Sequence, residues 1–245
     1  MKEISFSRLI HITLESIWLL LKHPVFLIPS LFAMCWMILI SLISLKIQFS
    51  LRTDFHQILW MIVYLLLVIV GLSACFAWIF LLARKALHSS SKNVFSFTLW
   101  RRSFVFYFLF VFSLVILWAI IQYGLLWIGP LLNIPLAFAQ VLYILLFFVA
   151  FVGFLIFYTY TPALLVTLSF SQSLKQSITL TKKNYLLTLS LSVIYFVLIS
   201  LCEKLLSSSV FEIFEYSLSL SEILIAFLIT PLLALILVLI VHEAS

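Results

Sequence analysis

Long apolar runs without a single Asp, Glu, Lys, Arg or His constrain this chain more than any other feature. The first run, Val25–Leu45, has 21 residues. As an α-helix rising 1.5 Å per residue it would reach about 31 Å, which matches a hydrocarbon core of roughly 30 Å. Together with five more runs of similar character, it predicts six transmembrane helices. The other five are Ile58–Ala83, Phe104–Ile128, Ile134–Thr161, Tyr185–Leu201 and Ile223–Val241.

The composition leaves no room for a water-soluble fold. Apolar residues make up 66% of the 245 residues and charged residues 9%, against about 45–50% and 25% in soluble domains. Fourteen Lys and Arg with eight Asp and Glu cannot form a charged shell around a core of this size. We therefore predict an all-α, polytopic membrane protein. Residues 1–245 would form a single transmembrane domain, with amphipathic helices at the cytoplasmic interface beside the six spans.

The end of the fourth span lies within a longer apolar stretch, which continues from Ile134 to Leu168. We place the end at Tyr158-Thr159-Tyr160-Thr161-Pro162. Tyrosine favours the headgroup region, and proline disfavours helix at the residue before it. Residues 163–170 are then expected near the interface.

The connections after the third and the fifth span lie on the side of the membrane opposite to the N-terminal segment, and they differ in composition from the other connections. Trp127-Ile128-Gly129-Pro130 is uncharged and predicts a tight turn. The connection after the fifth span combines acidic and aromatic residues, among them Glu203, Glu222 and Phe211. That mixture predicts a short amphipathic segment lying on the outer surface.

The charges of the connections give the orientation independently. Eleven of the fourteen Lys and Arg fall in the N-terminal segment and in the second and fourth connections, and three in the others. Because positive connections stay in the cytoplasm, both termini are predicted there, in a bacterial inner membrane. These basic side chains are the candidate contacts for anionic lipid headgroups. They are Arg8, Lys22, Arg84, Lys85, Arg101, Arg102, Lys175, Lys182 and Lys183.

Residues 1–24 are predicted to form an amphipathic helix at the interface. At 100° per residue, Arg8, His11, Glu15 and Lys22 lie within about 60° of one another, and apolar residues fill the rest of the wheel. Such a narrow polar stripe is typical of a helix that lies in the membrane surface.

A short pattern recurs ahead of three spans: Ser5-Phe6-Ser7, Ser96-Phe97-Thr98 and Ser169-Phe170-Ser171. It indicates three units, each with a cytoplasmic helix followed by a transmembrane hairpin. In the third unit, Ser171 is the expected N-cap. The alternative is that Ser, Phe and Lys agree by chance at membrane boundaries, and the sequence leaves both open.

The sequence offers little chemistry. No ionisable side chain falls within a predicted span, which disfavours ion-coupled transport. Soluble-enzyme motifs are missing, so we expect no enzyme, catalytic residue, cofactor or metal. His11 and Glu15 could supply two metal ligands, but an i, i+4 surface pair is favoured. Gln122, Gln140 and Tyr143 lie in the spans, where they indicate either a polar path for a solute or hydrogen bonds between helices.

These features favour a non-catalytic membrane protein that acts through lipid or protein contacts. The expected partners are membrane lipids, and possible ones are a second membrane protein or another copy of the chain. No feature indicates nucleic acid, because the basic residues lie beside the apolar runs. The alternative is a permease or channel component for a neutral or hydrophobic solute.

Several short elements resemble a known family. Thr161-Pro162-Ala163-Leu164-Leu165-Val166 is followed by Ser171-Gln172-Ser173-Leu174-Lys175-Gln176-Ser177 and by Leu180-Thr181-Lys182-Lys183-Asn184. With Trp18 and Lys22-His23-Pro24, they resemble six-pass bacterial membrane proteins similar to the membrane domain attached to some glycerophosphodiester phosphodiesterases. The resemblance implies a six-helix membrane domain over most of the chain. Ser173 stands where the family usually has Ala. The chain has no room for a phosphodiesterase domain, so that activity is not implied.

Overall fold

A computed structural model describes residues 4–48, 54–87, 97–131, 136–206, 210–213, 216–219 and 223–244. Near the α4–α5 connection and in the two strands only the backbone is described. Among the described residues, six helices are long and apolar enough to cross a membrane. The prediction of an all-α, multi-pass membrane protein with six spans is therefore confirmed.

The helices follow one another along the chain with two short breaks in regularity. The elements are α1 (Phe6–Lys22), the 3₁₀ turn η1 (Pro24–Phe26), α2 (Leu27–Gln48), α3 (Asp54–Leu87), α4 (Phe97–Leu131), α5 (Leu136–Tyr158), α6 (Thr161–Leu164), α7 (Phe170–Lys183) and α8 (Tyr185–Leu206), then strands β1 (Val210–Ile213) and β2 (Tyr216–Ser219), the π-helical turn η2 (Ile225–Ile229) and α10 (Thr230–Ala244).

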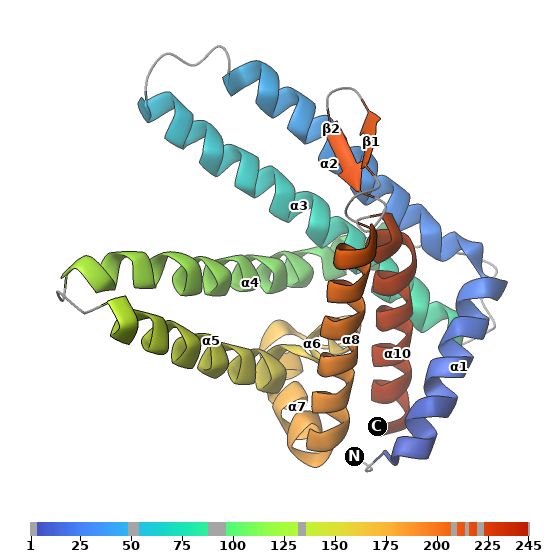
Figure 1. Ribbon diagram of the computed structural model, residues 1–245. Coiled ribbons are helices and arrows are strands. Elements are labelled where there is room, and N and C mark those ends of the chain that lie inside the picture. Colours follow the sequence, from blue (N-terminus) through green and yellow to red (C-terminus); the bar gives the residue numbers. More distant parts are fainter. Residues whose placement is uncertain are drawn as a thin grey trace.

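Two helical hairpins, α2/α3 and α4/α5, spread outward as arms from a shared base (Figure 1). α8 also runs out of this base, and α10 packs on α1, α3 and α6. We use the term base for α1, α6 and α7 together with the ends of α3, α4, α5, α8 and α10 that contact them. Both chain ends lie there (Figure 1). The segments that the charge pattern assigned to one side of the membrane thus gather at one end of the molecule.

The three predicted units are alike in part. α1, α4 and α7 each begin at the phenylalanine of the recurring pattern, at Phe6, Phe97 and Phe170. Ser5 and Ser169 are the N-caps of α1 and α7, so Ser171 as a cap was wrong by two residues. In the second unit α4 continues from Phe97 directly into its span, and residues 88–96 lie outside the described part. The repeat therefore stays a prediction.

The predicted tight turn at Trp127-Ile128-Gly129-Pro130 is wrong, because α4 continues to Leu131. Pro130 stands one residue before the end of that helix, where it removes one backbone N–H from the hydrogen-bond ladder without ending the helix earlier. In the predicted outer segment after the fifth span, the described residues form an antiparallel pair, with Val210 opposite Ser219 and Ile213 opposite Tyr216. The amphipathic character of this segment stays a prediction, because its side chains lie outside the described part.

The last span carries a wide turn immediately before its proline. Thr230 donates its backbone N–H to Ile225 O, five residues back, and its hydroxyl donates to the same oxygen at 2.9 Å. Pro231 has no N–H to continue the α-helical ladder. The π turn at Ile225–Ile229 therefore stands where the regular hydrogen-bond pattern is interrupted.

One glycine allows the helices of the α2/α3 arm to approach each other closely. Trp36 of α2 lies directly over Gly71 of α3, and its indole N–H donates to Leu67 O at 3.0 Å. A Cβ built on Gly71 would lie 2.1 Å from the Trp36 ring. Farther out, the Trp60 indole donates to Ser44 Oγ at 3.0 Å. Glycine at position 71 thus sets how closely the two helices approach.

The core of the base forms where α5 ends. Tyr160 is fully buried, and its hydroxyl is 2.8 Å from Thr188 Oγ1 of α8. Tyr107 of α4 is also fully buried and donates to Pro162 O at 2.6 Å. The helix break at Tyr158–Pro162 is confirmed. Of the residues 163–170 expected near the interface, Ala163 to Leu165 are buried inside the protein and Val166 to Phe170 are at least partly exposed. Their position relative to the membrane stays a prediction.

Candidate functional site at the base

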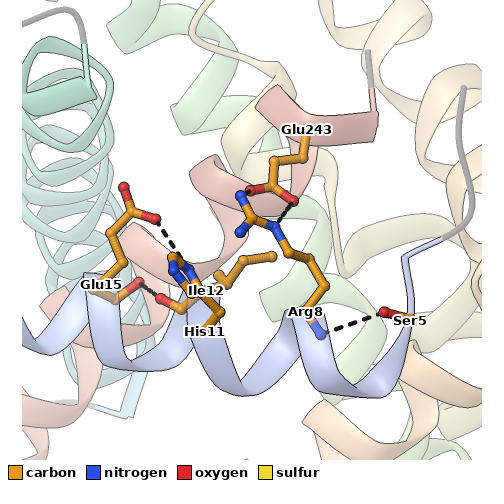
Figure 2. A network of polar contacts seen from close by, with 7 residues as sticks. Ser5, Arg8, His11, Ile12, Glu15 and Glu243 are labelled. Carbon is orange, nitrogen blue, oxygen red and sulfur yellow. Dashed lines mark hydrogen bonds and ion pairs between the residues drawn. The ribbon is translucent and has the colours of Figure 1, made fainter.

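The start of α1 is fixed at three points. Ser5 Oγ accepts from Arg8 N at 3.4 Å, which caps the helix. Ile4 N donates to Asn184 Oδ1 at 2.9 Å, next to the junction of α7 and α8. Arg8 forms a two-point ion pair with Glu243 near the end of α10 (Figure 2), with Nε 2.9 Å from Oε2. The Glu243 carboxylate raises the pKa of the Arg8 guanidinium, chiefly through this hydrogen bond.

The body of α1 has two apolar faces. One packs into the base through Leu9, Ile12, Leu19 and Leu20, all of them buried. The other is exposed along the full length of the helix, and we call it the α1 stripe. It consists of Phe6, Ile10, Leu14, Ile17, Trp18 and Leu21. A contiguous exposed apolar patch of this kind marks a site of contact with a membrane or another protein.

Basic side chains lie near both ends of the α1 stripe, and others are exposed elsewhere on the base. Lys22 Nζ lies 4.4 Å from the centre of the Trp18 ring, in a cation–π contact. Lys182 and Lys183 are exposed in the last turn of α7. The Ile4–Asn184 bond brings the start of α1 next to that turn. Lys175 on α7 and Arg101 and Arg102 at the start of α4 are exposed as well.

Arg84 and Lys85 differ from the other predicted headgroup contacts. They lie in the last turn of α3 and are only partly exposed. Arg84 forms no hydrogen bond or ion pair within the described ranges. It lines a partly open pocket of about 200 Å³ formed by α3, α6, α7, α10 and the segment between α6 and α7.

The pocket combines a few polar groups with aliphatic walls. Arg84, Thr167, Gln176 and His242 supply the polar side chains. The walls are Leu and Val residues with Ala163, and the described lining residues include no carboxylate. Glu243, the residue after His242, is paired with Arg8 (Figure 2). The pocket is therefore positively charged at one wall and apolar at the others.

Sequence reasoning selected Arg84 but missed Thr167, Gln176 and His242. Gln176 and His242, for example, are more than 60 positions apart along the chain. Their common pocket arises from packing of α10 on α3 and α6. Gln176 gave no local signal, because most residues of α7 are polar.

The predicted intramembrane path is not tested by the structure. Gln122 lies in α4, and Gln140 and Tyr143 lie in α5, but their side chains fall outside the described part. The transport alternative stays a prediction. Liposome flux that disappears on replacing Gln122 or Gln140 would support it.

His11 and Glu15 form the predicted i, i+4 pair on α1, with Nδ1 3.8 Å from Oε2 (Figure 2). Searched over its described residues, the chain brings no three His, Cys, Asp or Glu side chains together as a group that could hold a metal ion. Cys35, Cys75 and Cys202 carry free thiols.

No protein-family model matches the chain, and neither a curated protein nor a solved structure is significantly similar to it. The resemblance to membrane domains of glycerophosphodiester phosphodiesterases therefore stays a prediction. The description of the site rests on the geometry of the base alone.

Proposed function

We propose that this chain is a non-catalytic protein of the bacterial inner membrane, with both termini in the cytoplasm, and that it binds anionic lipid through its base. The observation that carries the proposal is the exposed α1 stripe with Lys22 on Trp18 near its end, together with further exposed basic residues elsewhere on the base. Apolar side chains of such a helix enter the boundary between headgroups and acyl chains, and Lys and Arg beside it attract anionic headgroups.

The distribution of acidic residues supports the same orientation. In the sequence, five of the eight Asp and Glu, Asp54 and the four from Glu203 to Glu222, fall in connections that the charge pattern assigns to the side opposite the termini. On the side of the base, the described carboxylates are Glu243, paired with Arg8, and Glu15, which lies near His11. Basic residues therefore outnumber the described carboxylates of the base, which favours lipid counter-charges.

Lipid analysis of the purified full-length protein tests the proposal. We expect phosphatidylglycerol and cardiolipin to be enriched over phosphatidylethanolamine, relative to the membrane from which the protein is extracted. Replacing Lys182, Lys183, Arg101 and Arg102 together by Gln is expected to remove most of that enrichment, because phosphate contacts of exposed Lys and Arg are electrostatic.

The matched control removes two basic residues from the other end of the molecule. Lys46→Gln with Lys204→Gln lowers the net charge but leaves the base unchanged, so the enrichment should persist. Equal lipid composition in the native protein and the bulk membrane would refute the proposal. A C-terminal reporter found outside the cell would refute its orientation.

A further inference from the structure

The Arg84 pocket is a second feature of the base, separate from the α1 stripe. The exposed lysines and arginines face outward on α1, α4 and α7, whereas Arg84 is half-buried at the pocket wall. Its guanidinium carries five N–H donors in a planar fork. Within the described chain none of them is used in a hydrogen bond or ion pair. A partly buried guanidinium in that situation favours an anionic ligand, because burial of an unpaired charge costs free energy.

One other polar group of the pocket fits the same chemistry. The Gln176 side chain at the wall carries an amide donor, whereas the Thr167 hydroxyl already donates to Leu164 O at 3.2 Å. Among the described lining residues there is no Asp or Glu that would compete for Arg84. Arg with an amide donor at the same wall matches a phosphate, whose oxygens accept several hydrogen bonds in a fork geometry.

The walls and the size of the pocket determine which phosphate it fits. Most of the lining is aliphatic, including Leu164, Leu168 and Val238. A hydrated inorganic phosphate would lose water against these walls without gaining contacts. A volume of about 200 Å³ is below the roughly 300–1,000 Å³ of pockets that enclose whole drug-sized ligands. The pocket is therefore suited to the headgroup end of an amphiphile whose chains remain outside it.

We propose that the Arg84 pocket binds the phosphate of a single anionic phospholipid, with Arg84 as its principal contact and Gln176 as a second donor. This site rests on the proposed lipid-binding function and adds a specific, saturable position to the diffuse charge of the base. The lipid chains then lie beside the exposed apolar surface of the protein.

Thermal unfolding of the full-length protein in a neutral detergent tests the site. Phosphatidylglycerol is titrated in one series. Diacylglycerol with the same acyl chains, which lacks the phosphate, is titrated in a parallel series. A ligand that binds the folded state raises the unfolding temperature with a saturable dose response. We expect saturable stabilisation by phosphatidylglycerol only. Arg84→Gln should weaken its apparent affinity by about 10- to 100-fold, since a charge-assisted contact to phosphate is lost.

Two further variants keep the test independent of folding defects. Arg84→Lys retains the charge without the fork and should weaken affinity less than Arg84→Gln. Gln176→Leu retains the size but removes the donor and should weaken affinity by about tenfold. Lys46→Gln, at the far end of α2, should leave the titration unchanged.

Three results would contradict the proposal that the Arg84 pocket binds the phosphate of a phospholipid. Equal weakening by Arg84→Gln and by Lys182→Gln with Lys183→Gln would show a diffuse charged surface, and the proposed function would survive without the site. Saturation by inorganic phosphate at millimolar concentration, with no added effect of phosphatidylglycerol, would assign the pocket to a free anion. No preference for phosphatidylglycerol over diacylglycerol would refute both the site and the proposed function.

Discussion

The base and the arms of this molecule are stabilised in different ways. In the base, buried hydroxyl and amide groups form hydrogen bonds between segments far apart in the chain, as Tyr160 does with Thr188 and Tyr107 with Pro162. In the α2/α3 arm, a tryptophan packs on a glycine. The outer faces of α5 and α8 expose large apolar side chains such as Phe148 and Phe196.

The difference follows from what surrounds each region. An arm immersed in lipid gains little from apolar contacts between helices, since lipid chains offer the same contacts, and its stability comes from close packing. The base combines polar side chains from several helices, and each buried polar group needs a partner. Close packing fixes the spacing of two helices, whereas the hydrogen bonds of the base fix the positions of individual groups. A specific binding site is therefore expected in the base.

The largest effect is expected from Gly71→Ala in the α2/α3 arm. The added Cβ would lie 2.1 Å from the Trp36 ring, so the ring or the whole helix has to move. Overpacking of this kind costs about 3 kcal/mol or more of unfolding free energy. Unfolding in mixed micelles with increasing sodium dodecyl sulfate measures it.

Gly153→Ala on α5 is the matched control for that substitution. A Cβ at Gly153 meets nothing within 4 Å, so stability should be unchanged or slightly higher. If the two alanines had the same effect, helix propensity rather than the contact with Trp36 would determine the stability of the arms.

The next largest effects are expected from the two tyrosines of the base. Each variant removes a buried hydroxyl. Tyr107→Phe leaves Pro162 O without its hydrogen-bond donor, and Tyr160→Phe leaves Thr188 Oγ1 without its hydrogen-bond partner. Each should lower the free energy of unfolding by about 1–3 kcal/mol. Tyr64→Phe in the α3 arm is the control, because the Tyr64 hydroxyl has no hydrogen bond in the part of the chain that the structure describes. A loss at Tyr64 equal to that at Tyr160 would contradict the comparison.

Sequence reasoning located the arms well and the base poorly. Apolar runs identify spans such as α2 and α8 because immersion in hydrocarbon requires about 20 apolar residues in succession. The C-terminal end of α4 was misjudged, since Gly129-Pro130 is read as a turn although the helix continues through both residues to Leu131. Local signals therefore predict which segments span and fail at their boundaries.

The interior of the base was not predictable from local pattern. Tyr158 and Tyr160 look alike as headgroup residues, yet Tyr160 is fully buried and bonded to Thr188, 28 positions away. Similarly, Arg84 was selected for its charge, but its pocket depends on Gln176 and His242. Such contacts depend on how helices pack, and a single sequence carries no periodicity that reports them.

A smaller effect distinguishes two serines on the buried face of α7. Ser177 Oγ accepts from Tyr160 N at 3.3 Å, whereas the Ser173 hydroxyl is buried and, within the described chain, has no hydrogen-bond partner. Ser177→Ala should cost about 1 kcal/mol of unfolding free energy. Ser173→Ala should be neutral or stabilising, since it removes an unsatisfied polar group. A larger loss at Ser173 than at Ser177 would indicate a partner for Ser173 that the described residues do not include.

The smallest effect is expected where the base meets water, at the ion pair between Arg8 and Glu243 (Figure 2). Arg8→Gln and Glu243→Gln should leave global unfolding nearly unchanged, because exposed ion pairs contribute little to stability. Hydrogen exchange should become faster in the first two turns of α1 and in the last turn of α10. The double variant should behave like either single variant, since both remove the same contact. High salt should speed exchange in the native protein toward the rate of the variants. Faster exchange along all of α1, independent of salt, would mean that the buried apolar face of the helix, and not the ion pair, determines how its start is held.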